Sequence, residues 1–327
     1  MKRVLPMVLF CCLPAFPAFA QNLQTDITFT RSTPLASGAE ILRRAFTPLS
    51  AGSAQNIVGL PLDVSHETFA VYVPAKKPPN GYALMVFVAP WDKAKMPEGW
   101  ASVLDDDGVI FVSADGSGND QPVRTRRMPL ALIAAENVMK QYPVDPSRVF
   151  VAGFSGGARV ALRLALAYPD IFRGAFLNSG SDPIGTPDDP LSPADLFLQF
   201  QTASNIVYAT GDLDQVPSNT ARASAASLTD FCVVHVSEMT MWNKAHETAD
   251  ESTLSKALDI LLAPAQPEDN ADCRAKLDSD VQAGLQKLES LIAAGDKAGA
   301  KAMLHDIDAK YGGLAAPKSV ELYLSLQ

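Results

Sequence analysis

The sequence predicts an α/β protein whose mostly parallel central sheet is covered by helices on both faces. Residues 83–88 and 109–112 are short runs without a polar residue, as is typical of strands buried on both faces of a sheet. Between such runs, residues 129–141 and 158–168 carry apolar residues at helical spacing. Strands that alternate with helices indicate βαβ units, so we expect most neighbouring strands to run parallel.

The elements of this α/β domain can be placed in order between residues 68 and 262. Residues 68–73 alternate in character and end at Pro74, which predicts an edge strand. The other predicted strands span residues 83–88, 109–112, 148–152, 174–177, 206–209 and 232–236, and the predicted helices span residues 129–141, 158–168 and about 220–228, with one more that ends at Leu262.

The two ends of the chain differ from this pattern. Residues 21–65 are polar and mixed, so they are included in the α/β domain, residues 21–262, without assigned elements. After residue 262, prolines and acidic residues indicate a connection, and we expect residues 263–327 to form a helical appendage. Its predicted helices span residues 278–293, 297–311 and 317–326.

Residues 1–20 have the composition of a secretory signal peptide. Lys2 and Arg3 precede a short apolar run, and Ala18 and Ala20 are small residues at the third and first positions before a cleavage site. The run is short for a membrane span and contains prolines, which disfavours a membrane anchor. We expect cleavage after about Ala20 and a secreted or periplasmic mature protein.

Composition, charge and the distribution of apolar residues argue against three classes of protein. The 327 residues are 47% hydrophobic and 19% charged, which is the balance of a folded chain rather than a disordered one. The formal net charge is −9, whereas nucleic-acid binding requires a basic surface, so we expect no nucleic-acid partner. Outside residues 1–20 no stretch is long and apolar enough to span a bilayer, so we expect no membrane span in the mature chain.

Cysteine usage predicts one disulfide. Cleavage of the signal peptide removes Cys11 and Cys12 and leaves Cys232 and Cys273. Two cysteines in an exported chain allow one intramolecular pairing, which an oxidising compartment preserves. We therefore predict a Cys232–Cys273 disulfide, with two separately buried thiols as the alternative.

The pattern G-x-S-x-G occurs at residues 153–157, between a predicted strand and a predicted helix. In that context it is typical of a nucleophile elbow, a sharp turn that exposes a serine hydroxyl and crowds the positions two before and two after it. Ser155 is therefore the candidate nucleophile. Gly156 carries a backbone N–H at the helix start, where it can stabilise an oxyanion. The alternative is an ordinary glycine-rich turn between strand and helix.

A serine hydroxyl needs a general base, and in chains with this elbow the acid and then the histidine follow the serine. His235 lies inside a predicted strand and His305 lies in the appendage, where structural or solvated positions are expected. His246 follows the last predicted strand on a loop, which makes it the candidate base.

The acid is expected after the strand at residues 206–209. The segment Gly211-Asp212-Leu213-Asp214 offers two candidates there. Asp214 has the usual spacing after the glycine and is preferred as the residue that orients His246. Asp212 remains the alternative and would otherwise shape the turn.

These motifs, together with residues 69–74 and 145–157, resemble the α/β-hydrolase superfamily, and in particular secreted serine esterases related to poly(3-hydroxyalkanoate) depolymerases and feruloyl esterases. The resemblance covers about residues 68–262. It implies the α/β-hydrolase fold and ester hydrolysis through an acyl-enzyme, with no metal or organic cofactor.

One segment departs from that group. These esterases usually carry a His-Gly pair after the buried strand before the oxyanion loop, whereas this chain has Ala89-Pro90-Trp91. Pro90 has no N–H to donate. We therefore assign the second oxyanion donor to the backbone N–H of Trp91.

Together these features predict an exported serine esterase that acts on a small-molecule or polymeric ester. A serine peptidase of the same fold is one alternative, and a catalytically weak α/β-hydrolase that acts as a binding or scaffolding protein is another. Residues 181–204, rich in proline and aspartate, are a candidate lid. Residues 115–119 either line the pocket or form a plain turn. Arg124, Arg126 and Arg127 are expected at a solvated helix start, with contact to an anionic substrate as the alternative.

Overall fold

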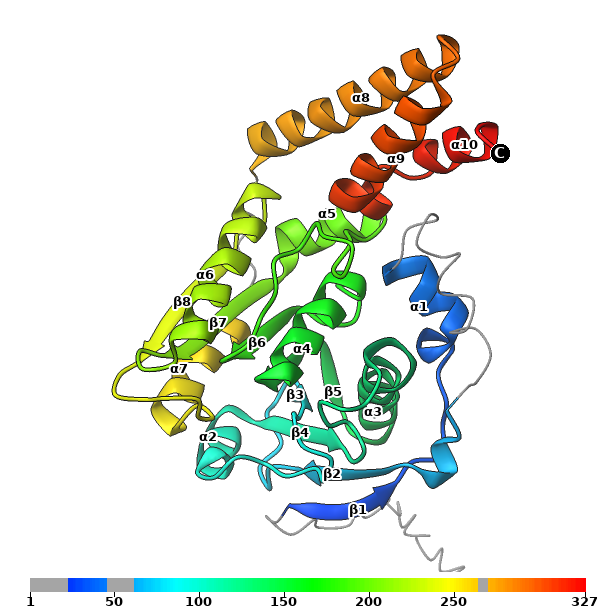
Figure 1. Ribbon diagram of the computed structural model, residues 1–327. Coiled ribbons are helices and arrows are strands. Elements are labelled where there is room, and N and C mark those ends of the chain that lie inside the picture. Colours follow the sequence, from blue (N-terminus) through cyan, green and yellow to red (C-terminus); the bar gives the residue numbers. More distant parts are fainter. Residues whose placement is uncertain (1–22, 46–61, 264–269) are drawn as a thin grey trace, which may run out of the picture.

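The computed structural model describes residues 23–45, 62–263 and 270–327 (Figure 1). The predicted signal peptide lies outside these residues, as does most of the connection after residue 262. The described residues form one eight-stranded sheet with the order β1-β2-β4-β3-β5-β6-β7-β8. The strands are β1 (Gln24–Thr28), β2 (Thr68–Tyr72), β3 (Tyr82–Val88), β4 (Val109–Ala114), β5 (Val144–Phe154), β6 (Gly174–Asn178), β7 (Asn205–Gly211) and β8 (Val236–Met241).

The sheet is parallel from β4 to β8 and antiparallel at the other end, where β2 pairs with both β1 and β4. The mostly parallel sheet predicted from the apolar runs is therefore confirmed. Because parallel strands end at the same edge, β5, β7 and β8 deliver the loops that follow them to one side of the sheet.

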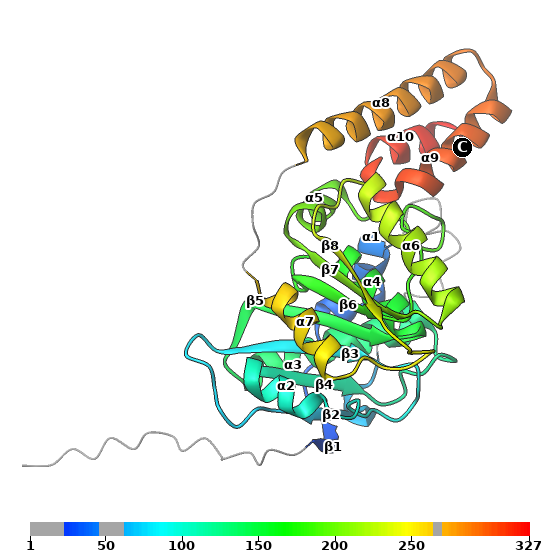
Figure 2. The same cartoon turned by 90° about the vertical axis from the view of Figure 1, so that its left-hand side faces the viewer.

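Helices cover both faces of the sheet, which explains why the central strands are apolar throughout. Along β3, Leu84 and Val86 pack in the core beneath α3 and α4, whereas Met85 and Phe87 pack on the opposite face with Trp100 of α2. Successive side chains of a strand point to opposite faces, so both sets must be apolar. One face carries α2 (Trp100–Asp107) and α7 (Glu251–Leu262), and the other carries α3 (Met128–Gln141), α4 (Gly156–Ala167) and α6 (Gln215–Asp230) (Figure 2).

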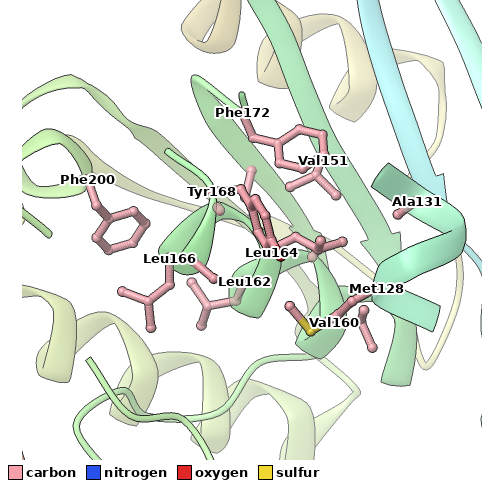
Figure 3. Close-up of a cluster of buried hydrophobic side chains, with 14 of the residues drawn as sticks. Met128, Ala131, Val151, Val160, Leu162, Leu164, Leu166, Tyr168, Phe172 and Phe200 are labelled. Atoms are coloured by element: carbon pink, nitrogen blue, oxygen red, sulfur yellow. The ribbon is translucent and has the colours of Figure 1, made fainter. Parts of the chain in front are cut away.

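The helix that follows the elbow, α4, is the most enclosed of these helices. Val160 and Leu164 are fully buried on it, and Val151 of β5 and Phe172 belong to the same apolar cluster (Figure 3). The remaining sides of α4 are covered by α1 (Gly38–Ala45) and α5 (Ala194–Ala203). This packing holds the start of α4, and with it the residue before it, on a rigid support.

The chain ends in three helices that extend beyond the sheet (Figure 1). The two long helices pack through apolar residues at helical spacing, including Leu277 and Leu285 on the first and Leu304 on the second. A disulfide between Cys232 and Cys273 joins the end of α6 to the start of the appendage. The helices are α8 (Ala271–Ala293), α9 (Lys297–Tyr311) and α10 (Lys318–Ser325).

The segment predicted as a lid is held against the body of the molecule. Asp189 forms an ion pair with Arg163 of α4, and the N–H of Ile184 donates to Ser227 Oγ of α6 at 3.0 Å. On its other side, the N–H of Gly313, after α9, donates to the carbonyl of Leu191 at 2.8 Å. Residues 181–193 thus contact α4 and α6 on one side and the turn after α9 on the other, and residues 194–203 are α5.

Two strand predictions are wrong. Strand β2 is not an edge strand, because β1 pairs along its outer side. The strand expected at residues 232–236 begins at Val236 instead, since Cys232 has a φ of 66° and the N–H groups of Cys232 and Val233 bond back to the last turn of α6.

Across residues 23–45, 62–263 and 270–327, no helix combines the length and apolarity needed to cross a membrane.

Candidate active site

Ser155 occupies the sharp turn between β5 and α4. Its φ of 55° and ψ of −124° lie outside the regions that non-glycine residues usually adopt, as expected for a strained elbow. The turn is held by the N–H of Ser155, which donates to the carbonyl of Asn178 at 2.9 Å. A Cβ on Gly153 would lie 2.3 Å from the backbone of Gly157, and one on Gly157 would lie 1.9 Å from the carbonyl oxygen of Val88. Both positions therefore require glycine.

The structure brings Ser155, His246 and Asp214 together. His246 Nε2 lies 2.8 Å from Ser155 Oγ, and His246 Nδ1 lies 2.7 Å from Asp214 Oδ2. Both distances are those of hydrogen bonds. The chain of contacts from carboxylate to imidazole to hydroxyl is the arrangement that activates a serine for nucleophilic attack.

Burial differs along this chain of contacts. The Asp214 side chain is 11% exposed and the His246 side chain is 44% exposed, so the carboxylate is enclosed while the imidazole faces solvent. The ring of Phe154 lies 4.9 Å from the imidazole at an interplanar angle of 36°, so it packs against His246. His246 is thus oriented by Asp214 and supported by Phe154, and remains open to an incoming molecule.

The loop that carries the candidate acid Asp214 (the acid loop) is in direct contact with residues 242–250, which carry the candidate base His246 (the base loop). The N–H of Leu213 donates to the carbonyl of Lys244 at 3.0 Å. A Cβ on Gly211 would lie 2.2 Å from that same carbonyl oxygen and 2.6 Å from the carbonyl oxygen of Ala245. Glycine at position 211 is what allows the base loop to pass so close to the end of β7.

The alternatives considered from the sequence lie elsewhere. Asp212 accepts a hydrogen bond from the N–H of Lys244 at 3.3 Å and is not the carboxylate that reaches His246. His235 precedes β8, at the opposite edge of the parallel sheet from the elbow. His305 lies on α9 with an exposed side chain. Neither histidine is brought to Ser155.

The two oxyanion donors predicted from the sequence lie at the start of α4 and in the loop after β3. Gly156 is the first residue of α4, so its N–H is among those that a helix leaves without an intrahelical acceptor. Trp91 follows β3, and its ring lies 6.0 Å from the ring of Phe154. The carbonyl of Pro90 accepts from the N–H of Asn119 at 3.0 Å, and a Cβ on Gly156 would lie 2.2 Å from Asn119 Oδ1. The loop after β4 therefore borders the elbow.

Arg127 connects the loop after β3 to the loop after β4, a role that the sequence did not indicate. Its guanidinium donates to the carbonyl of Ala89 at 2.9 Å and to that of Ser117 at 2.8 Å, and the residue is only 3% exposed. Arg126 forms a bidentate pair with Glu67, and Arg124 donates to the carbonyl of Asp188. The expectation of a solvated helix start was wrong for Arg127. Its guanidinium is buried because it donates hydrogen bonds to two carbonyls inside the protein.

Comparison with known proteins gives a matching family model and a curated relative. Residues 135–279, which include Ser155, Asp214 and His246, match the family model described as "Putative esterase". A poly(3-hydroxybutyrate) depolymerase from Ralstonia pickettii is 31% identical over 139 residues, a match that covers 34% of this chain and 28% of that protein. The matched region is thus well under two thirds of the length of this curated relative.

Similar solved structures include two hydrolases. Est1E from Butyrivibrio proteoclasticus has 14% identity and a TM-score of 0.46, with 62% of this chain and 96% of that chain covered. An S-formylglutathione hydrolase from Staphylococcus aureus has 13% identity and a TM-score of 0.48, with 62% and 94% covered.

The order of the sheet and the elbow between β5 and α4 are those of the α/β-hydrolase fold. In sequence, the chain resembles esterases over the matched residues. The fold class expected from the sequence is confirmed.

Proposed function

We propose that this protein is an exported serine esterase that hydrolyses carboxylic esters through an acyl-enzyme. The observation that carries the proposal is the pair of hydrogen-bond distances that link Asp214 to His246 and His246 to Ser155. In the acylation step, Ser155 Oγ attacks the ester carbonyl while His246 Nε2 accepts its proton. His246 then returns that proton to the alkoxide that leaves.

Hydrolysis of the acyl-enzyme repeats these steps with water. His246 removes a proton from water, the resulting hydroxide attacks the acyl carbon, and the proton passes to Ser155 Oγ as the acid departs. Asp214 keeps the imidazole in the required tautomer and stabilises its charged form in both halves of the cycle. The N–H groups of Gly156 and Trp91 are proposed to stabilise the oxyanion in each tetrahedral intermediate.

The surface around the proposed triad supports an ester with apolar groups as substrate. Leu213 and Val216, on either side of Asp214 in sequence, are exposed, and Trp242, at the end of β8, is 75% exposed. Large apolar side chains that remain in solvent near a reactive centre are available to bind apolar parts of a substrate. The name of the Ralstonia pickettii relative makes esters of 3-hydroxybutyrate the first compounds to test.

Export is supported by two features. The chain begins with a basic and then apolar segment typical of signal peptides, and the Cys232–Cys273 disulfide is of the kind that persists in oxidising compartments. Export predicts that protein recovered from the periplasm or the medium begins near Gln21, which N-terminal sequencing measures. Recovery of a chain that still begins at Met1 would contradict it.

The decisive experiment compares wild-type protein with Ser155→Ala on p-nitrophenyl acetate and butyrate, on feruloyl and 3-hydroxybutyrate esters, and with a fluorophosphonate probe. We expect loss of turnover by about 10⁶-fold and loss of labelling in the variant, because the acyl-enzyme cannot form. Undiminished turnover in Ser155→Ala would refute the assignment of the nucleophile. Absence of labelling in the wild-type protein would favour a binding protein, and preference for a peptide amide over its matched ester would favour a peptidase.

A further inference from the structure

Asn178 is a fully buried asparagine, 0% exposed, at the carboxyl end of β6. Its backbone carbonyl accepts the hydrogen bond from the N–H of Ser155 that fixes the elbow. The residue is therefore held next to the elbow, at the end of a strand whose five residues are all buried.

The carboxamide of Asn178 is bonded to the loop that carries His246. Its Oδ1 accepts from the N–H of Ala249 at 2.7 Å, and its Nδ2 lies 3.3 Å from the carbonyl oxygen of Glu247. Nδ2 also lies 3.2 Å from the carbonyl oxygen of Ala209 in β7, the strand that leads to Asp214. One side chain thus contacts the base loop on both sides of residue 248 and the strand of the acid.

The base loop is also held at Lys244, which bonds to Asp212 and Leu213, and at Ala249, whose carbonyl accepts from Trp100 Nε1 at 2.8 Å. Residues 242–250, between β8 and α7, contain no helix or strand, and the imidazole that they carry is partly exposed. Proton transfer requires that Ser155 Oγ and His246 Nε2 stay within hydrogen-bond distance. A displacement of a catalytic group by 1 Å can lower the rate about 100-fold. A buried side chain that ties the loop to the elbow supplies such a restraint.

We propose that Asn178 is a positioning residue, which holds His246 in register with Ser155 by bonding the backbone of the base loop to the end of β6. The proposal rests on the proposed function. Asn178 itself does not touch the reacting atoms; it acts through the peptide groups of Glu247 and Ala249.

The chain offers a matched control in Asn137 of α3. Asn137 is 1% exposed and also bridges backbone groups: its Nδ2 donates to the carbonyls of Arg31 and Ile133 at 2.8 and 2.9 Å, and its Oδ1 accepts from the N–H of Arg31 at 3.3 Å. These contacts anchor the N-terminal segment and lie away from the elbow and the base loop. A change at Asn137 therefore reports what the loss of a buried, bonded asparagine does to stability alone.

The test compares Asn178→Asp with Asn137→Asp. Aspartate retains the shape and the Oδ1 acceptor but replaces the amide donor by an oxygen that faces carbonyl groups. We expect both variants to have a lower thermal midpoint. For Asn178→Asp we also expect kcat on a p-nitrophenyl ester and the rate of fluorophosphonate labelling to fall at least about 10-fold, with KM changed less than about three-fold, because the substrate surface is intact while the base is displaced. For Asn137→Asp we expect both rates to stay within about two-fold of wild type.

Asn178→Ser, which removes the reach to Glu247 and Ala249 without burying a charge, serves if Asn178→Asp does not fold. Equal kcat in wild type and in the folded Asn178 variant, with only the thermal midpoint lowered as for Asn137→Asp, would overturn the positioning role and leave the proposed function standing. A wild-type protein that neither turns over esters nor reacts with the probe would overturn both.

Discussion

The carboxylate of Asp212 accepts a hydrogen bond from the backbone N–H of Lys244 at 3.3 Å, two residues before His246. The N–H of Asp212 in turn donates to the carbonyl of Met241 at 3.2 Å. Asp212 therefore shapes the junction between the acid loop and the base loop, while Asp214, two residues later, bonds to the imidazole itself. The two aspartates have separable roles, which leads to the first prediction.

Asp214→Asn is expected to lower kcat by about 10⁴-fold, because an amide facing Nδ1 selects the wrong tautomer of the imidazole. Asp212→Asn keeps an oxygen that can accept from Lys244 and is expected to lower kcat by less than about ten-fold. Steady-state kinetics on a p-nitrophenyl ester, with circular dichroism to confirm folding, measure both. The reverse order of effects would make Asp212 the triad acid.

The glycines of the elbow should differ in their tolerance of a methyl group. In Gly157→Ala the new Cβ meets the carbonyl oxygen of Val88, which belongs to β3 and cannot move away. In Gly156→Ala the new Cβ meets Asn119 Oδ1, the end of an exposed side chain that can rotate. We expect Gly157→Ala to lower the free energy of unfolding by about 1–3 kcal/mol or more, and Gly156→Ala to cost less.

Chemical denaturation measures this difference. A second variant, Asn119→Ala combined with Gly156→Ala, removes the side chain that the methyl group meets and should restore stability to that of Asn119→Ala alone. Equal destabilisation by Gly156→Ala and Gly157→Ala would show that the elbow is not packed as described.

Arg127 is expected to matter for turnover through the loop that leads to Trp91. Burial, with the neighbouring charge of Arg163, lowers the pKa of Arg127 to about 10, but the guanidinium is still protonated at pH 8 because that pH lies below this pKa. In Arg127→Lys a single ammonium replaces two N–H groups that reach separate carbonyls. We expect kcat to fall about ten-fold or more because the oxyanion loop loses its tie to the loop after β4.

The control for this prediction is Arg44→Lys. Arg44 is also buried and also bonded to a carbonyl, that of Ala167, but it joins α1 to α4 far from the oxyanion loop. Its substitution should lower the thermal midpoint and leave kcat unchanged. Loss of stability without loss of kcat in Arg127→Lys would restrict Arg127 to a structural role.

Sequence patterns predicted those parts of the molecule in which one local constraint dominates. Strands such as β3 and β4 must be apolar on both faces, and the elbow must have glycine at positions 153 and 157, so both are visible in the sequence. Strand β1 carries the single large apolar residue Ile27 among polar neighbours, so no alternation marked it as the true edge. The residue types at positions 232 and 233 favour a strand, so a strand was predicted to start there. In the structure the N–H groups of Cys232 and Val233 instead donate to carbonyls in the last turn of α6.

Residues whose roles depend on distant partners could not be found in this way. Arg127 is buried because it donates to the carbonyls of residues 89 and 117, and Asn178 bonds to residues 209, 247 and 249. An isolated asparagine after a strand resembles a turn residue, and an arginine in a basic run resembles a solvated one. Only the three-dimensional arrangement distinguishes them from such residues.

The Cys232–Cys273 disulfide closes a loop of sequence separation 41 and is the covalent tie between α6 and α8. In the chain-entropy model, a cross-link of this span contributes about 4 kcal/mol to the free energy of unfolding by restricting the unfolded chain. None of the hydrogen bonds of Ser155, His246 and Asp214 involves either cysteine. We therefore expect the Cys232→Ser/Cys273→Ser double variant to have a clearly lower thermal midpoint and a kcat within about two-fold of wild type. Dithiothreitol added to the wild-type protein should lower the midpoint in the same way and should not change the double variant, which is the control for effects of the reductant elsewhere. Two free thiols titrated in the unreduced, denatured mature protein would contradict the disulfide, and a loss of turnover equal to that of Ser155→Ala would show that the appendage, held by this bond, takes part in forming the active site.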